Sequence, residues 1–118
     1  MISFDDVPVY LACGPTDLRK HINGLCTMVK ANFQMDPFAS ALFVFCNRNK
    51  DQLKILFFDG DGFMLLIKRL EKGRFRWPDK TDDKDTMALD ILELTSLLSL
   101  TRLERRFKRD EVTETRTY

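Results

Sequence analysis

A cluster of cations near the middle of the chain is the clearest chemical signal in the sequence. The segment "KRLEKGRFRWP" (68–78) contains a single acid, Glu71. Its cations are Lys68, Arg69, Lys72, Arg74 and Arg76. Guanidinium groups bind phosphate oxygens through paired hydrogen bonds, and ammonium groups bind them as point charges. The cluster therefore indicates a surface that could bind a polyanion.

The net charge of +1 conceals an uneven distribution along the chain. Residues 47–78 carry 8 cations and 4 acids, whereas residues 79–101 carry 2 cations and 6 acids. Residues 102–118 carry 6 cations and 4 acids. Because a clustered basic segment is the usual electrostatic footprint of a nucleic-acid-binding protein, this distribution favours nucleic acid as the partner.

Two carboxylates in the "DGDG" turn raise the alternative of a metal-dependent enzyme. Asp59 and Asp61 resemble the start of a calcium-binding loop, but Leu70 stands where such a loop requires a bidentate Glu. Acids in a tight glycine-containing turn are also ordinary turn formers. We therefore expect no enzymatic activity, no catalytic residue and no cofactor.

The remaining candidate metal ligands are three cysteines and one histidine. Cys13, Cys26 and Cys46 have no metal-finger spacing, and each lies in an apolar context. His21 has no partner that suggests a triad or a zinc site. The cysteines are predicted to be reduced thiols in the core, and no metal site is predicted.

Length and composition indicate one small domain. We expect a single domain over residues 1–110 and a mobile tail over residues 111–118, because the tail has no apolar period. No apolar run approaches the ~20 residues that span a bilayer. The N-terminus carries acids where a signal peptide needs a basic region, so a soluble cytoplasmic protein is expected.

The elements that must position the cations are predicted to form an α+β domain. Apolar residues at helical spacing predict a helix over 16–34, with Thr16 as its N-cap. This helix is expected to pack on an antiparallel β-meander, followed by a loop over 79–85 and a C-terminal helix that buries Leu94, Leu97 and Leu98. The predicted strands are 7–12, 41–46, 53–58, 63–70 and 74–77.

Turn geometry fixes the expected strand pairing. The "DGDG" turn pairs Phe58 with Phe63, Leu56 with Leu65, and Lys54 with Ile67. A second turn at Lys72-Gly73 would place Arg69 opposite Arg76. The face with Leu53, Ile55, Phe57, Leu70, Phe75 and Trp77 is expected to pack against the N-terminal helix, with Lys68 as its one charge. The opposite face would carry Lys54, Arg69, Arg74 and Arg76.

Two interpretations of this basic face stay open from the residues alone. Like charges directly opposite each other are unfavourable, which favours a face kept for an anionic partner. A merely solvated face is the alternative, because arginine side chains can splay apart and water screens them. The predicted nucleic-acid-binding residues are Arg48, Lys54, Lys68, Arg69, Lys72, Arg74 and Arg76.

Several motifs in order resemble one bacterial protein family. "YLACGPTDLRKHINGL", "FVFCNR", "LKILFFDGDGF" and "KRLEKGRFRWP" are similar to the TnpB-type accessory protein, the second open reading frame product, of the insertion-sequence family numbered sixty-six. The resemblance implies a non-catalytic protein needed for transposition beside a DDE transposase. The chain departs from the family at Phe57-Phe58 and Met64-Leu65, where Tyr or Trp is common, but these positions stay apolar.

The resemblance leaves two functions to distinguish. The first is an accessory factor that binds transposon DNA through the basic face. The second is a protein-interaction module that binds the transposase or another accessory protein without contacting DNA. The DNA site, the protein partner and the oligomeric state are not determined by the sequence.

Overall fold

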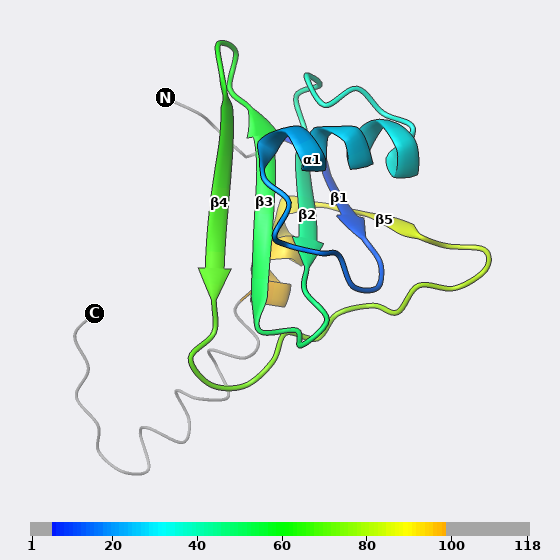
Figure 1. Cartoon of the computed structure of the whole chain (residues 1–118), viewed down its shortest axis with the longest axis vertical. Helices are drawn as coiled ribbons and strands as arrows, with labels where there is room; N and C mark the ends of the chain where they lie inside the picture. The colour runs from blue at the N-terminus through cyan, green and yellow to red at the C-terminus, as the bar shows by residue number, and fades with distance from the viewer. Residues whose placement is uncertain (1–5, 99–118) are drawn as a thin grey trace.

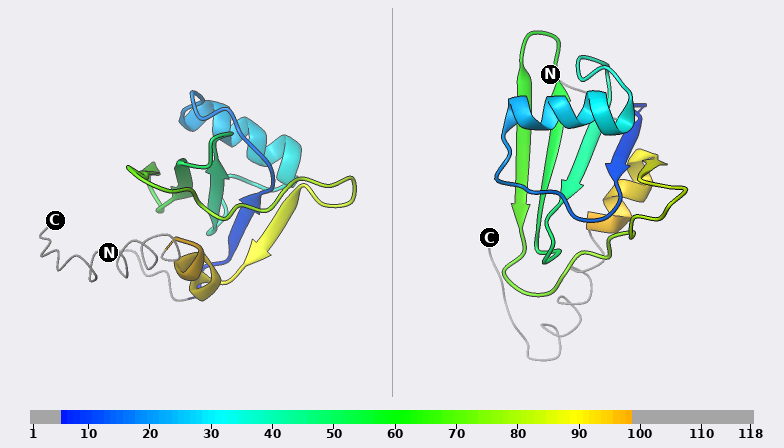
Figure 2. Two further views of the ribbon diagram at one scale, coloured as in Figure 1. Left: turned by 90° about the horizontal axis from the view of Figure 1, so that it is seen from below. Right: turned by 45° about the vertical axis from the view of Figure 1, so that its right-hand side comes forward.

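The structure, a computed structural model, describes residues 6–98 and contains a five-stranded sheet between two helical layers (Figures 1 and 2). In chain order the elements are β1 (Val9–Ala12), α1 (Ile22–Met28), the π-helical turn η1 (Val29–Phe33), β2 (Leu42–Cys46), β3 (Gln52–Phe58), β4 (Phe63–Arg69) and β5 (Thr86–Leu89). Residues 91–98 form a further helix, called here the 91–98 helix. The predicted α+β class is confirmed.

The sheet has the strand order β4-β3-β2-β1-β5 and is mixed. β1 and β2 are parallel, because α1 and η1 connect them as a crossover, and the other pairs are antiparallel. The predicted β3–β4 register is confirmed, with Phe58 opposite Phe63 and Lys54 opposite Ile67. Gly60 makes the short turn possible, since its φ of 105° is readily adopted only by glycine.

The helix α1 begins later than predicted. Residues 16–20 are not helical, and His21 rather than Thr16 precedes the first turn, without a side-chain cap. Thr16 instead lies buried, and its backbone N–H donates to the Cys46 carbonyl at 2.7 Å. The chain at Thr16 is therefore bonded to the end of β2, and α1 begins only after residue 21.

The α1–η1 layer covers the opposite face of the sheet from the one predicted for the N-terminal helix. Leu25 and Val29 of the α1–η1 layer pack with Phe43, Phe45 and Leu56. The opposite face, which was expected to receive α1, is covered by the 91–98 helix and by the segment 70–78 (Figure 2). Its buried residues include Val44, Leu53, Ile55, Leu70, Phe75, Trp77 and Leu94.

The segment 70–78 is not the predicted hairpin strand. The Leu70 N–H donates to Asp51 O and the Phe75 N–H donates to Lys50 O, both at 2.7 Å. These bonds draw the chain across the end of the sheet, past the β2–β3 turn, instead of back along β4 (Figure 1). Consequently Arg69 is not paired with Arg76, although Phe75 and Trp77 are buried as predicted.

The start of the predicted C-terminal helix is replaced by β5. Residues 86–89 pair antiparallel with β1, with Val9 opposite Leu89, and so cover an edge that β1 would otherwise expose. The 91–98 helix begins after Asp90 with a capping box: the Glu93 N–H donates to Asp90 Oδ1 at 2.7 Å, and the Asp90 N–H donates to Glu93 Oε1 at 3.0 Å. The predicted loop over 79–85 is confirmed.

The C-terminal predictions are only partly covered by the described residues. Leu94 is buried and Leu97 and Leu98 pack partly buried against the core, as expected. The predicted tail over 111–118 and the basic residues after 101 lie outside the described residues. The single domain over 1–110 stays a prediction.

Candidate nucleic-acid interface

One end of the sheet brings together most of the predicted binding residues. We call this surface the basic end and define it by exposed cations of the β2–β3 turn and the segment 69–76: Arg48, Arg69, Lys72, Arg74 and Arg76. It lies at the lower edge of the molecule in Figure 1, where β4 ends and β3 begins. The hydrogen bond from Phe75 N–H to Lys50 O joins the two segments that form it.

Two buried aromatic side chains direct the arginines of the basic end outward. Phe75 and Trp77 are buried in the core, whereas Arg74 and Arg76 alternate with them and are exposed. Trp77 Nε1 donates to the Ala12 carbonyl at 2.9 Å, which fixes the segment against β1. The segment therefore presents its guanidinium groups from an anchored backbone rather than from a hairpin.

The acids nearest the basic end are already engaged. Glu71 Oε2 accepts a hydrogen bond from Arg69 Nε at 3.1 Å, and Asp79 lies 4.0 Å from Lys50 Nζ. Asp51 accepts a bond from Asn47 Nδ2 at 2.7 Å. Such exposed ion pairs contribute little to stability. The cations of this surface outnumber these three acids.

Lys54 does not belong to the basic end. Its side chain lies on the same face of the sheet as Arg69, as predicted, but the residue is only 4% exposed. Its Nζ donates to Leu18 O at 2.6 Å and to Lys20 O at 3.0 Å. The expectation that Lys54 contributes to an open basic face is therefore wrong, because the loop before α1 covers it.

Lys68 lies on the opposite face of the sheet from Arg69. It is partly buried, and its Nζ donates to Leu98 O at 3.4 Å, beside the 91–98 helix. Lys50, which sequence reasoning omitted, lies in the β2–β3 turn next to Arg48 with its side chain 42% exposed. Its position in the same charged turn as Arg48 was the signal that could have identified it.

A polar groove adjoins the basic end on the side of Arg48. It has a volume of about 630 Å³ and lies between the loop 15–19 and the β2–β3 turn. In its wall, Arg19 binds Asp17 through both carboxylate oxygens, at 2.9 and 2.7 Å. The guanidinium of Arg19 lowers the pKa of the Asp17 carboxyl well below its usual range, so this pair stays ionised.

The carboxylates of the "DGDG" turn have a structural role. Asp59 Oδ1 accepts the Gly62 N–H at 3.2 Å and, with the spacing of an Asx turn, the Asp61 N–H at 3.5 Å. The hydrogen bond between Asp59 and Asp61 lowers the pKa of Asp59 and raises that of Asp61. Within residues 6–98, no group of three histidine, cysteine or acidic side chains is arranged to hold a metal ion.

All three cysteines are free thiols, as predicted. Cys13 and Cys46 are buried and Cys26 is partly buried. Burial raises the pKa of each thiol, to about 12 for Cys46, so the thiols remain protonated and weakly nucleophilic near neutral pH.

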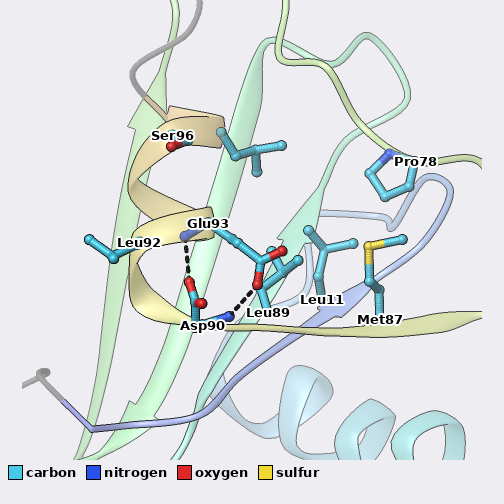
Figure 3. A pocket seen from close by; sticks show the side chains of 9 residues that line it. Leu11, Pro78, Met87, Leu89, Asp90, Leu92, Glu93 and Ser96 are labelled. Atoms are coloured by element: carbon cyan, nitrogen blue, oxygen red, sulfur yellow. Dashed lines mark hydrogen bonds between the residues drawn. The ribbon is translucent and has the colours of Figure 1, made fainter.

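An apolar groove lies on another part of the surface, between β5 and the 91–98 helix (Figure 3). It has a volume of about 460 Å³, and Leu11, Pro78 and Met87 form one of its walls. Asp90 and Glu93 border it from the helix side, where they hold each other in the capping box. Leu92, at the same groove, is 74% exposed.

Most of the chain matches one known protein family. Residues 7–108 match the family model described as IS66 Orf2 like protein. The chain belongs to this family. The matched range of this IS66 Orf2-like protein includes every residue of the basic end, and membership indicates an accessory role in transposition.

Two curated relatives of this family member come from Sinorhizobium fredii (strain NBRC 101917 / NGR234). The uncharacterized protein y4hO is 36% identical over 97 residues, which cover 82% of this chain and 83% of the relative. The uncharacterized protein y4jC is 32% identical over 99 residues, which cover 83% of this chain and 85% of the relative. No solved structure matches the chain. In the described part of the chain, no helix has the length and apolar character needed to cross a membrane.

Proposed function

We propose that this chain is a non-catalytic accessory protein of transposition that binds transposon DNA through the basic end. The observation that carries the proposal is the anchored segment 70–78, in which buried Phe75 and Trp77 alternate with exposed Arg74 and Arg76. The bond from Phe75 N–H to Lys50 O adds Arg48 to the same surface. Family membership supports the role in transposition.

The expected contacts are to the phosphate backbone rather than to base edges. Arginine and lysine side chains that neutralise phosphates release counterions, which gives affinity and a strong salt dependence but little sequence specificity. The proposed contact residues are Arg48, Lys50, Arg69, Lys72, Arg74 and Arg76. Lys54 and Lys68 are left out because the structure directs their ammonium groups to backbone carbonyls.

Replacing an arginine of the basic end should weaken DNA binding without unfolding the protein. For Arg74→Ala and Arg76→Ala we expect weaker binding to transposon-end DNA and to unrelated DNA alike. Each lost phosphate contact should reduce the slope of log affinity against log salt by about 0.9. The free energy of unfolding should change by no more than about 0.5 kcal/mol, because both side chains are exposed.

The measurement is a fluorescence-anisotropy titration at several salt concentrations. Lys84→Ala is the matched control, because Lys84 is an exposed cation in the acidic loop away from the basic end, and it should bind DNA like the parent. A parent protein that binds no DNA at low salt would contradict the proposal. Arginine variants with the parental affinity and salt slope would contradict it as well.

A second candidate function is a protein-interaction module for the transposase or another accessory protein. The apolar groove between β5 and the 91–98 helix and the exposed Leu92 favour it. The salt titration separates the two functions, since association through an apolar groove should weaken little as salt rises.

A further inference from the structure

The edge strand β4 leaves backbone groups and apolar side chains exposed together. β4 is the last strand of the sheet on its side, and its outer edge pairs with no strand in the described part of the chain (Figure 1). Met64, Leu66 and Ile67 are 40%, 45% and 56% exposed. Proteins usually protect such an edge with proline, bulges or central charges, whereas the cations of β4 lie only at its end.

The ladder to β3 shows which backbone groups of β4 point outward. The Asp59 N–H donates to Gly62 O at 2.9 Å, and the Leu70 N–H donates to Asp51 O at 2.7 Å. Hydrogen-bonded pairs alternate along an antiparallel ladder, so Met64, Leu66 and Lys68 exchange bonds with β3. The groups that point away from the sheet therefore belong to Phe63, Leu65, Ile67 and Arg69.

We propose that two copies of the chain associate by antiparallel pairing of β4 with β4 across a twofold axis at Leu66. In this register Leu66 faces its own counterpart in a non-hydrogen-bonded pair. Leu65 exchanges hydrogen bonds with Ile67 of the second copy, and Phe63 with Arg69 of the second copy. All outward backbone groups of the strand are then satisfied, and the two sheets form one continuous sheet. This inference does not depend on the proposed DNA binding.

The side chains of β4 favour a second copy as the occupant and favour this register. Leu66 is the middle residue of β4, so a twofold axis there lets all seven residues of the strand pair with the seven residues of the second copy. It places Lys68 opposite Met64 and Arg69 opposite Phe63, so no cation faces a cation across the interface. An axis at Lys68 would oppose two lysines. The strand is therefore complementary to itself in charge and in apolar character, as an isologous interface requires.

A charge swap at Leu66 tests both the pairing and its register. The parent should sediment as a dimer at concentrations above its dissociation constant. Leu66→Lys and Leu66→Glu should each raise the dimer Kd by about tenfold or more, because each places two like charges in direct opposition. An equimolar mixture of the two variants should recover a one-to-one dimer, because the opposed charges then attract.

Leu92→Lys is the matched control for the added charge. Leu92 is exposed at the groove beside β5, which is the edge strand opposite to β4, so this variant should dimerise like the parent. Near-ultraviolet circular dichroism verifies the fold of each variant. A parent that is monomeric at every concentration would overturn the proposal. The edge of β4 would then be covered by another segment of the chain or by another protein, and either case contradicts pairing with a second copy. Charged variants that dimerise like the parent, or a mixture that stays monomeric, would overturn it too.

A cysteine at the same position gives a second readout that adds no charge. Residues in a non-hydrogen-bonded antiparallel pair have Cα atoms about 4.5 Å apart, which suits a disulfide. Leu66→Cys should therefore form a covalent dimer on mild oxidation, and Leu92→Cys should not do so at the same protein concentration. Equal crosslinking of the two variants would contradict the pairing.

Discussion

Replacing Trp77 by alanine should lower the free energy of unfolding by about 3–5 kcal/mol, the usual cost of deleting a buried aromatic side chain. Trp77 is buried with Phe75 and Leu70 in the core between the sheet and the 91–98 helix. Its Nε1 also donates to the Ala12 carbonyl at 2.9 Å, so the substitution removes a hydrogen bond together with the packing. Urea denaturation followed by circular dichroism measures the change.

The variant Trp77→Phe separates packing from hydrogen bonding. Phenylalanine keeps much of the apolar surface but leaves the Ala12 carbonyl without the indole donor, which should cost about 1–3 kcal/mol. A Trp77→Ala protein within about 1 kcal/mol of the parent would show that the segment 70–78 is not anchored through this side chain. The outward direction of Arg76 would then lose its structural explanation.

Local sequence signals were sufficient to predict strand pairing where the two strands are close together in the chain. The turn at Gly60-Asp61 fixed the register of β3 and β4, because a short hairpin loop leaves few ways to align its strands. The alternation of side chains also placed Lys54 and Arg69 correctly on one face. Neither result required knowledge of distant segments.

The errors arose where a distant segment decided the outcome. Lys72-Gly73 has the composition of a hairpin turn, but the bonds to Asp51 O and Lys50 O lead the chain across the sheet end. Residues 86–89 have helix-forming neighbours, yet they pair with the otherwise uncovered edge of β1 and form β5. Tertiary context commonly overrides such weak local preferences.

The basic end illustrates both outcomes in one surface. The residue types of the segment 68–76 pointed to anion binding, and the burial of Phe75 and Trp77 followed from their spacing. Lys50 could have been identified from its position in the same turn as Arg48. The bond that its carbonyl accepts from the Phe75 N–H, which joins this turn to the segment 69–76, is contained in no local pattern. The exclusion of Lys54 likewise depends on the path of residues 18–20, which no period of the β3 sequence reveals.

Replacing Lys54 by methionine should destabilise the fold and leave DNA binding unchanged. The substitution keeps the length of the side chain but removes the ammonium that donates to Leu18 O and Lys20 O. The loss of these bonds should cost about 1–3 kcal/mol, since a buried acceptor without a donor bears its full desolvation penalty. Urea denaturation gives the stability, and the salt-titrated anisotropy assay gives the binding.

Two opposing effects determine the sign of this change. Removing a buried charge relieves a desolvation cost, which alone would stabilise the variant. The carbonyls cannot easily turn to water, however, because buried Leu18 and the bond from Thr16 N–H to Cys46 O hold the loop in place. We therefore expect net destabilisation. Lys50→Met, in the partly exposed β2–β3 turn, is the matched control and should change stability by no more than about 0.5 kcal/mol.

The two assays together assign a role to each cation. Replacing a structural cation such as Lys54 should lower the free energy of unfolding and leave the salt slope of DNA binding at the parental value. Arg76→Ala should instead keep the parental stability and reduce the salt slope. Suppose that Lys54→Met retained the parental stability and reduced the salt slope by about 0.9. The Lys54 ammonium of the parent protein would then have to contact a phosphate. The loop before α1 would then have to open when DNA binds, and Lys54 would return to the interface.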